Sequence, residues 1–418
     1  MKTKYVILFL LIGILVIIYG NVSQIFALSL IAICLKRGAG CQYFYNPYWI
    51  LIITLVSYLC YSSVIGGYFL DDLEIKTQIL IVSSLAMIIL GFISAERKKI
   101  KPISVGKYSE NFWIIFLLGF IPTIITYALF GNVLELTGDS LIEAKGNQGV
   151  PIIGQMAYFL PASILIACKK DSKVLIVISI IFSIIAALFT VTKTAVLVAA
   201  LFLVFGIVRY RPSLMQSKVA KLTKKTLPVW LPIGLIFFFV FNNAIRHDAT
   251  SNRDMDYMEQ GGVDRVYKST NLSEGLYLNY LYFTSPWSNL NYNVKNNQER
   301  GYGRNIFAQF SKKIGIDIKT VNKNHPTFLN TFSYLTDIFL DFGFIGSIIF
   351  SFFFGFLIFL IYKKFGYSDD PLLLAFYVLV AYATFMLFFN NHFNNGYLLN
   401  YFITFVGYSY IARKLAKK

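Results

Sequence analysis

The residues YLTDIFLDFGFIGSIIFSFFFGFLIFLIY, at positions 334–362, form an apolar run longer than the roughly twenty residues a helix needs to cross a bilayer. Hydrophobic residues make up 56% of the 418-residue chain, which leaves too little polar surface to close a soluble domain. The sequence therefore predicts an all-α, polytopic integral membrane protein. Further apolar runs of spanning length lie at 48–66, 77–95, 112–130, 152–168, 174–190, 194–209, 227–243, 371–389 and 397–413.

The number of spans depends on the first apolar stretch, residues 5–35. One long tilted helix there predicts eleven spans in total, and a hairpin broken at Gly20-Asn21 predicts twelve. Lysines at positions 2 and 4 and the basic pair at 36–37 flank the stretch, and both groups favour the cytoplasm. We therefore expect about twelve spans, with eleven as the alternative.

The net charge of +17 comes mostly from Lys and Arg residues beside apolar runs, a pattern typical of topology signals rather than of nucleic-acid binding. The positive-inside rule places these clusters and both termini in the cytoplasm, and it places the intervening loops outside. The basic clusters lie at 97–99, 169–170, 209–225, 363–364 and 413–418, and the predicted outer loops at 67–76, 131–151, 244–330 and 390–396.

Residues 244–330 are polar, aromatic and slightly basic, in contrast to the chain on either side. They divide it into N-terminal spans (1–243), a large loop (244–330) and C-terminal spans (331–418). Proteins that only transport a substrate rarely have such a loop, so we expect catalysis or recognition at one membrane face. Within it, residues 275–292 predict an interfacial helix and a turn at Pro286, and residues 300–317 predict a Gly-rich turn followed by a short helix.

Cations at the predicted outer face are candidates for binding phosphate or pyrophosphate, which guanidinium groups hold bidentately. Arg246 is the strongest candidate because it lies where a predicted span enters the loop. Lys193 lies between two apolar runs, where a charge needs either the interface or an anionic partner. The alternatives are ion pairs with loop acids and a tight interfacial turn. Weaker candidates continue along the loop: Arg253, Arg265, Arg300 and Arg304.

Two carboxylates begin the 334–362 run, Asp337 and Asp341, which are four residues apart and so share one helix face. A carboxylate at that depth faces a wet cavity or a cation. One of them, or His325 in the loop, is a candidate base for the proton of an acceptor hydroxyl. The alternative for Asp337 is a favourable interaction with the helix N-terminus, and a lone loop histidine is more often inert.

The aromatic residues of 275–292, including Tyr280 and Trp287, have two equal interpretations: stacking on sugar rings, or an aromatic belt at the membrane interface. The chain has no phosphate-binding loop, dinucleotide fingerprint or zinc-ligand spacing. None of its four cysteines lies in the loop. We therefore expect no cofactor and no metal.

These features resemble the Wzy-type oligosaccharide repeat unit polymerases of O-antigen and capsule synthesis. In that family a segment N-x-F-x-x-L-x-x-x-x-x-D-F-G-x-x-G begins the span after the catalytic loop. The stretch YFTSPWSNLNY at 282–292, with Asn289, resembles the family's Tyr-Pro-Asn segment, and Arg246 lies where the family has an arginine at the start of the loop. The residues that match the longer segment are Asn330, Phe332, Leu335, Asp341, Phe342, Gly343 and Gly346.

Two departures accompany the resemblance. Family members often carry Ser-Arg at the mouth of an earlier helix hairpin, where this chain has Thr192-Lys193. The related O-antigen ligases have a histidine shortly before the Gly-x-x-Gly, where this chain is apolar near Phe332. The second departure disfavours a ligase.

The resemblance implies a GT-C-like membrane glycosyltransferase of the bacterial inner membrane, with the loop in the periplasm. It would transfer a growing glycan from undecaprenyl pyrophosphate to a lipid-linked repeat unit during lipopolysaccharide or capsule synthesis. Its partners would be membrane lipids, a chain-length regulator and a flippase. Arg246 and Lys193 would bind pyrophosphate, and Asp341 or His325 would assist the acceptor hydroxyl. Weaker substrate contacts would be Arg253, Arg265, Arg304, Tyr280, Trp287 and Asn289.

Two other functions remain open from the sequence. A flippase or transporter of lipid-linked oligosaccharide would predict pseudo-repeated halves with short loops, and this chain shows neither. A ligase-like membrane enzyme of surface glycans is the other alternative.

Overall fold

The computed structural model describes residues 22–41, 45–62, 73–100, 111–130, 159–189, 193–211, 274–297, 299–313, 318–323 and 331–391, with single positions beyond and between these ranges. Within them the chain is helical and has no strand. The helices that correspond to predicted apolar runs are α2 (Val22–Gly40), α3 (Pro47–Ser62), α5 (Ile75–Glu96), α6 (Phe112–Phe130), α9 (Ala162–Lys169), α10 (Lys173–Phe189), α11 (Lys193–Tyr210), α16 (Tyr334–Ile361) and α17 (Pro371–Phe385).

Four of the described helices are long and apolar enough to cross a membrane: α2, α5, α16 with its π-helical extension η5 (Tyr362–Gly366), and α17 with the short 3₁₀ turn η6 (Met386–Phe388). The predicted span at 227–243, nearly all of the one at 397–413 and the first part of the stretch at 5–35 lie outside the described residues. The total of eleven or twelve spans therefore stays a prediction.

The surface of α16 carries a row of exposed apolar side chains. Ile345, Ile349, Phe353 and Leu357 are four residues apart, and between 51% and 71% of each is exposed. A similar row lies on α10, at Val174, Val177, Ile181 and Ile184. Such continuous apolar surface is unfavourable in water, whereas it is the ordinary exterior of a helix in lipid. These rows indicate a membrane-embedded helical protein.

Helices α5 and α16 pack in the same direction with their backbones close together. A Cβ atom on Gly91 would overlap the carbonyl oxygen of Phe352, and one on Gly355 would overlap the carbonyl of Ile88. Lys363 Nζ, just beyond the end of α16, donates to the Glu96 carbonyl at 2.8 Å at the end of α5. Small residues permit this approach, which is how helices gain dispersion energy where lipid removes the hydrophobic driving force.

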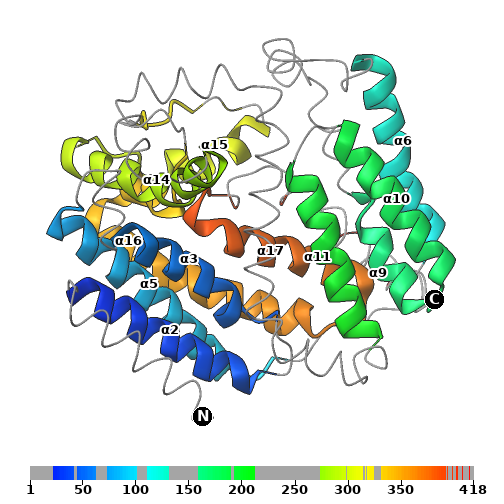
Figure 1. Ribbon diagram of the computed structural model, residues 1–418, viewed down its shortest axis with the longest axis horizontal. Coiled ribbons are helices and arrows are strands. Elements are labelled where there is room, and N and C mark those ends of the chain that lie inside the picture. Colours follow the sequence, from blue (N-terminus) through cyan, green and yellow to red (C-terminus); the bar gives the residue numbers. More distant parts are fainter. Residues whose placement is uncertain are drawn as a thin grey trace.

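Helix α17 is buried on all sides, as is expected for a helix that is apolar all round. It lies between two groups of helices, with α2, α3, α5 and α16 on one side and α6, α9, α10 and α11 on the other (Figure 1). The tertiary contacts join α17 to α3, α9 and α11. The core of the bundle is therefore built around this helix.

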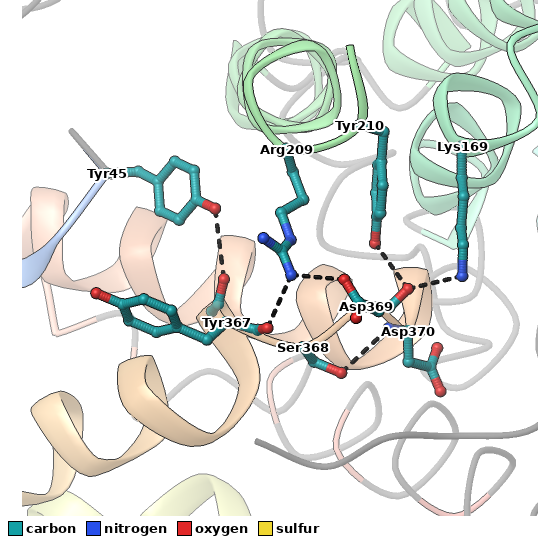
Figure 2. A network of polar contacts seen from close by, with 9 residues as sticks. Tyr45, Lys169, Arg209, Tyr210, Tyr367, Ser368, Asp369 and Asp370 are labelled. Carbon is teal, nitrogen blue, oxygen red and sulfur yellow. Dashed lines mark hydrogen bonds and ion pairs between the residues drawn. The ribbon is translucent and has the colours of Figure 1, made fainter. Parts of the chain in front are cut away.

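A polar network closes one end of the bundle (Figure 2). Arg209 Nη2, in the last turn of α11, donates to the Tyr367 carbonyl at 2.9 Å and pairs with Asp369 Oδ1 at 2.6 Å. Lys169 Nζ, at the end of α9, donates to the Asp369 carbonyl at 2.8 Å, and the Tyr210 hydroxyl does so at 3.3 Å. Basic residues that the charge pattern assigns to a single face thus meet at the α16–α17 connection.

The opposite end carries the described part of the large loop, as helices α14 (Glu274–Asn296) and α15 (Arg304–Lys313). Both lie toward the ends at which α5 and α16 begin (Figure 1). Glu74, which precedes α5, donates a hydrogen bond on this side: its backbone N–H is 3.1 Å from Asn291 Oδ1, the acceptor. Within the described residues, the basic ends of α9 and α11 and the loop helices α14 and α15 therefore lie at opposite ends of the bundle (Figure 1). Which membrane face each end occupies stays a prediction.

The prediction of a turn at Pro286 is wrong, because α14 continues through this proline. Proline interrupts helical hydrogen bonding on the preceding turn. There the Ser57 hydroxyl of α3 donates to the Phe283 carbonyl at 2.6 Å, so a tertiary contact stabilises the helix at this point. The Gly-rich turn followed by a short helix is confirmed, with the turn at 301–303 and the helix α15.

Candidate functional site

The described part of the loop docks on a break in α16. Gly343 interrupts this helix with φ 69° and ψ −164°. Just before the break, the Leu340 carbonyl accepts from Gly301 N–H at 2.9 Å, and the Asp341 carbonyl accepts from Tyr302 N–H at 3.0 Å. A broken helix needs outside partners for its backbone groups. The turn at 301–303 supplies two of them, so the loop and the span form one hydrogen-bonded unit.

Asp341 holds the beginning of α15. Its side chain is fully buried, and it accepts backbone N–H groups from Asn305 on Oδ1 at 3.0 Å and from Ile306 on Oδ2 at 2.9 Å. A carboxylate at this position satisfies free N–H groups of the first turn and interacts favourably with the helix dipole. Both oxygens are therefore committed to positioning α15, which does not favour the predicted role of Asp341 as a base. That role stays untested.

Two glycines make this docking possible. A Cβ atom on Gly301 would overlap Asp341 Oδ1, so only glycine fits beside the carboxylate. Gly343 has a positive φ, and a Cβ there would lie 3.1 Å from Arg300 Nε. The structure thus explains two residues of the Asp341-Phe342-Gly343 triplet: the aspartate holds α15, and the glycine allows the break.

Two arginines flank the junction. Arg300 places its guanidinium carbon 4.9 Å from the centre of the Phe339 ring, and its Nη1 donates to the Glu299 carbonyl at 2.9 Å. Arg304 donates to two carbonyls of the turn, those of Gly301 at 3.0 Å and Arg300 at 2.9 Å. It also pairs with Glu299 Oε1 at 3.5 Å, so the alternative of an ion pair with a loop acid holds for Arg304. Phosphate binding by either arginine stays a prediction.

Asp337 faces different partners, although it shares a helix face with Asp341 by spacing. Its Oδ1 pairs with Lys323 Nζ at 2.5 Å, and its Oδ2 accepts from Asn391 Nδ2 at 3.0 Å. Lys323 Nζ also lies 5.3 Å from the centre of the Phe332 ring. The expectation that a carboxylate here faces a cation is therefore met by Asp337, whereas Asp341 faces backbone N–H groups instead. Sequence reasoning missed Lys323 and Asn391, because nothing local marks either residue as its partner.

Two side chains of α14 that were predicted to bind glycan, Trp287 and Asn289, have structural partners. Trp287 is fully buried, and its Nε1 donates to Ser57 Oγ at 2.9 Å. Asn289 Nδ2 donates to the Thr331 carbonyl at 2.7 Å, and the Ser285 and Thr331 hydroxyls are 2.8 Å apart. These contacts join α14 to α3 and to the chain leading into α16. Trp287 thus offers no open ring face for a sugar, and a glycan role for Asn289 stays a prediction.

The remaining predicted residues are not placed in the site. Arg246, Arg253, Arg265 and His325 lie outside the described residues. Lys193 begins α11 and Tyr280 lies in α14, but the side chains of both are outside the described part of the chain. The structure therefore brings together Asp341, Arg304 and the previously less favoured Arg300, and adds the Lys323–Asp337–Asn391 cluster.

Within the described ranges, no group of three or more His, Cys, Asp and Glu residues lies close enough to hold a metal ion. The polar groups at this end are guanidinium, ammonium, carboxylate and amide groups, which suit ligands with anionic and hydroxyl groups. Comparisons with protein-family models, with curated proteins and with solved structures found no match.

Proposed function

We propose that this protein is a membrane glycosyltransferase that polymerises a bacterial surface polysaccharide. It would transfer the growing glycan from undecaprenyl pyrophosphate onto a lipid-linked repeat unit at the periplasmic face of the inner membrane. The proposal includes a GT-C-like fold of about twelve spans with the large loop outside. One observation supports it most: the described part of the loop packs on α16 at the point where Gly343 interrupts this helix. Asp341, just before the interruption, accepts hydrogen bonds from the first turn of α15.

This arrangement supports the proposal because it joins a polar segment to an apolar span. A lipid-linked sugar has the same division, with a polyprenyl chain in the bilayer and an anionic, hydroxyl-rich head at the interface. Arg300 and Arg304 are held at this junction. A substrate with both parts would meet lipid-facing helices and cationic loop residues at one place.

The chemistry needs no nucleotide, since the pyrophosphate of the donor is already a good leaving group. The acceptor oxygen forms the new bond to the anomeric carbon while the bond from that carbon to the pyrophosphate oxygen breaks. Basic residues stabilise the charge that develops on the leaving group. In the proposal these are Arg246 and Lys193, with Arg253, Arg265 and Arg304 in support. His325 accepts the acceptor proton, and Asp341 positions α15.

Deleting the gene and separating surface glycans on a gel tests the function. A polymerase predicts loss of the long-chain ladder while caps with a single repeat remain. Lipid-linked repeat units retained at the cytoplasmic face would contradict the proposal in favour of a flippase. Full-length polymer that accumulates on undecaprenyl pyrophosphate without transfer would contradict it in favour of a ligase.

A further inference from the structure

Asp337 is the point at which three separate segments meet at the beginning of α16. Lys323 comes from the returning arm of the large loop, and Asn391 from the connection that follows α17. In this cluster the carboxylate is buried and the cation is not: Asp337 is 2% exposed, whereas 31% of the Lys323 side chain is exposed. The ammonium group therefore has access to solvent that its partner lacks.

This pair has the properties of an exchangeable contact. Burying the carboxylate is costly, and because the ammonium is partly exposed, solvent screens the attraction that offsets this cost. Among the described residues, the other contact of the ammonium is with the Phe332 ring, and such contacts are weak where solvent reaches them. If Lys323 leaves, Asp337 keeps the hydrogen bond from Asn391, which offsets part of the cost of leaving the buried carboxylate without its cation, and the incoming phosphate must supply the rest. A second anion at the surface can thus compete with Asp337 for Lys323.

We propose that Lys323 is a phosphate-binding residue that Asp337 neutralises when no substrate is bound. The ligand is the phosphate or pyrophosphate group of a lipid, and its identity as the donor headgroup rests on the proposed function. A phosphate carries more charge than a carboxylate and offers more oxygens to an ammonium, so it forms the stronger charge-assisted hydrogen bonds. On binding, Lys323 moves from Asp337 to the phosphate, and the arm at 318–323 moves with it.

The proposal predicts opposite effects for the two partners. Lys323→Gln removes the cation and lowers phosphate affinity about tenfold, as is typical for a charge-assisted contact. Asp337→Asn removes the competitor and raises affinity several-fold. The double variant behaves like Lys323→Gln, because the aspartate matters only through the lysine. The control is Lys319→Gln, an exposed lysine on the same arm, which leaves affinity unchanged.

Binding is measured on the full chain in lipid nanodiscs by native mass spectrometry with undecaprenyl phosphate, and by calorimetry with inorganic pyrophosphate. Lys323-dependent binding of either probe supports the proposal, and binding of the lipid alone assigns the site to a headgroup. A folded Asp337→Asn variant with unchanged or weaker affinity overturns it, as does equal loss of affinity in the Lys319 and Lys323 variants. Neither measurement uses glycan synthesis, so failure of the proposed function is seen separately in the deletion strain.

Discussion

At the residue scale, the two aspartates of α16 show how far spacing predicts a role. Asp337 and Asp341 were expected on one face, and both are buried there, yet they have unlike partners. Asp341 accepts two backbone N–H groups of α15, whereas Asp337 accepts an ammonium and an amide. Spacing along a helix predicts which side of the helix a side chain is on. What a carboxylate does there depends on its partner, which comes from a distant segment of the chain.

Asp341→Ala should lower stability, because the N–H groups of Asn305 and Ile306 lose their acceptors. The expected cost is about 1–2 kcal/mol, the usual range for loss of a helix cap. Asp341→Asn keeps one acceptor oxygen and should lie between the wild type and the alanine variant. Thermal melting in detergent measures both. An asparagine variant with wild-type stability and no activity would contradict the positioning role and support a base.

Arg246→Ala should abolish long glycan chains while leaving expression unchanged, because it removes the main cation proposed for the pyrophosphate. The readout is the glycan ladder in the deletion strain complemented with each variant. Lys295→Ala is the control, since this lysine pairs with Glu74 on the exposed side of α14. Normal ladder length in the Arg246 variant would remove this residue from the mechanism.

At the element scale, helices formed where apolar runs predicted them, and the exceptions were decided by tertiary contacts. The run at 112–130 became α6 with the expected bounds. Pro286 predicted a turn, but Ser57 of another helix stabilises α14 at that point. The break at Gly343 was not predicted, because glycine within an apolar run is ordinary and the turn that pairs with the break lies elsewhere in the chain.

Gly355→Leu should separate α5 from α16, because even a Cβ atom at this position overlaps the Ile88 carbonyl. A loss of about 1–3 kcal/mol is expected, as for overpacking of a close contact. Phe353→Leu is the control, because this side chain lies in the exposed row on α16. Both variants are compared by melting temperature in nanodiscs. Equal melting of the two would show that the close approach is not needed.

At the scale of the whole molecule, two groups of polar contacts lie at opposite ends of the described bundle. Arg209, Lys169 and Asp369 meet at one end, and α14 and α15 cover the other (Figures 1 and 2). The charge pattern along the sequence predicts that these two groups lie on different membrane faces, and that assignment stays a prediction. The physical basis of that prediction is that positively charged loops tend to be retained in the cytoplasm during insertion, which depends on local composition.

Cysteines placed at Lys319 and at Lys99 should be labelled from opposite sides of the membrane. Both positions are exposed, and they belong to the two different ends of the bundle. A membrane-impermeant maleimide added to spheroplasts should modify Cys at 319, whereas Cys at 99 should react only after permeabilisation. Labelling is read on the individual peptides by mass spectrometry. If the cysteine at position 99 reacts in intact spheroplasts, the orientation of the protein is the opposite of the one predicted.

By itself, the sequence determined that this protein is helical and suited to a membrane, and it located most of the described helices. Apolar content is a local property, and a helix in lipid satisfies its own backbone hydrogen bonds. Tertiary structure alone decided that Asp341 holds α15, that Lys323 and Asn391 meet at Asp337, and that α14 passes through Pro286. These pairings join segments far apart in the chain, and each buried polar group takes the partner that packing brings within reach.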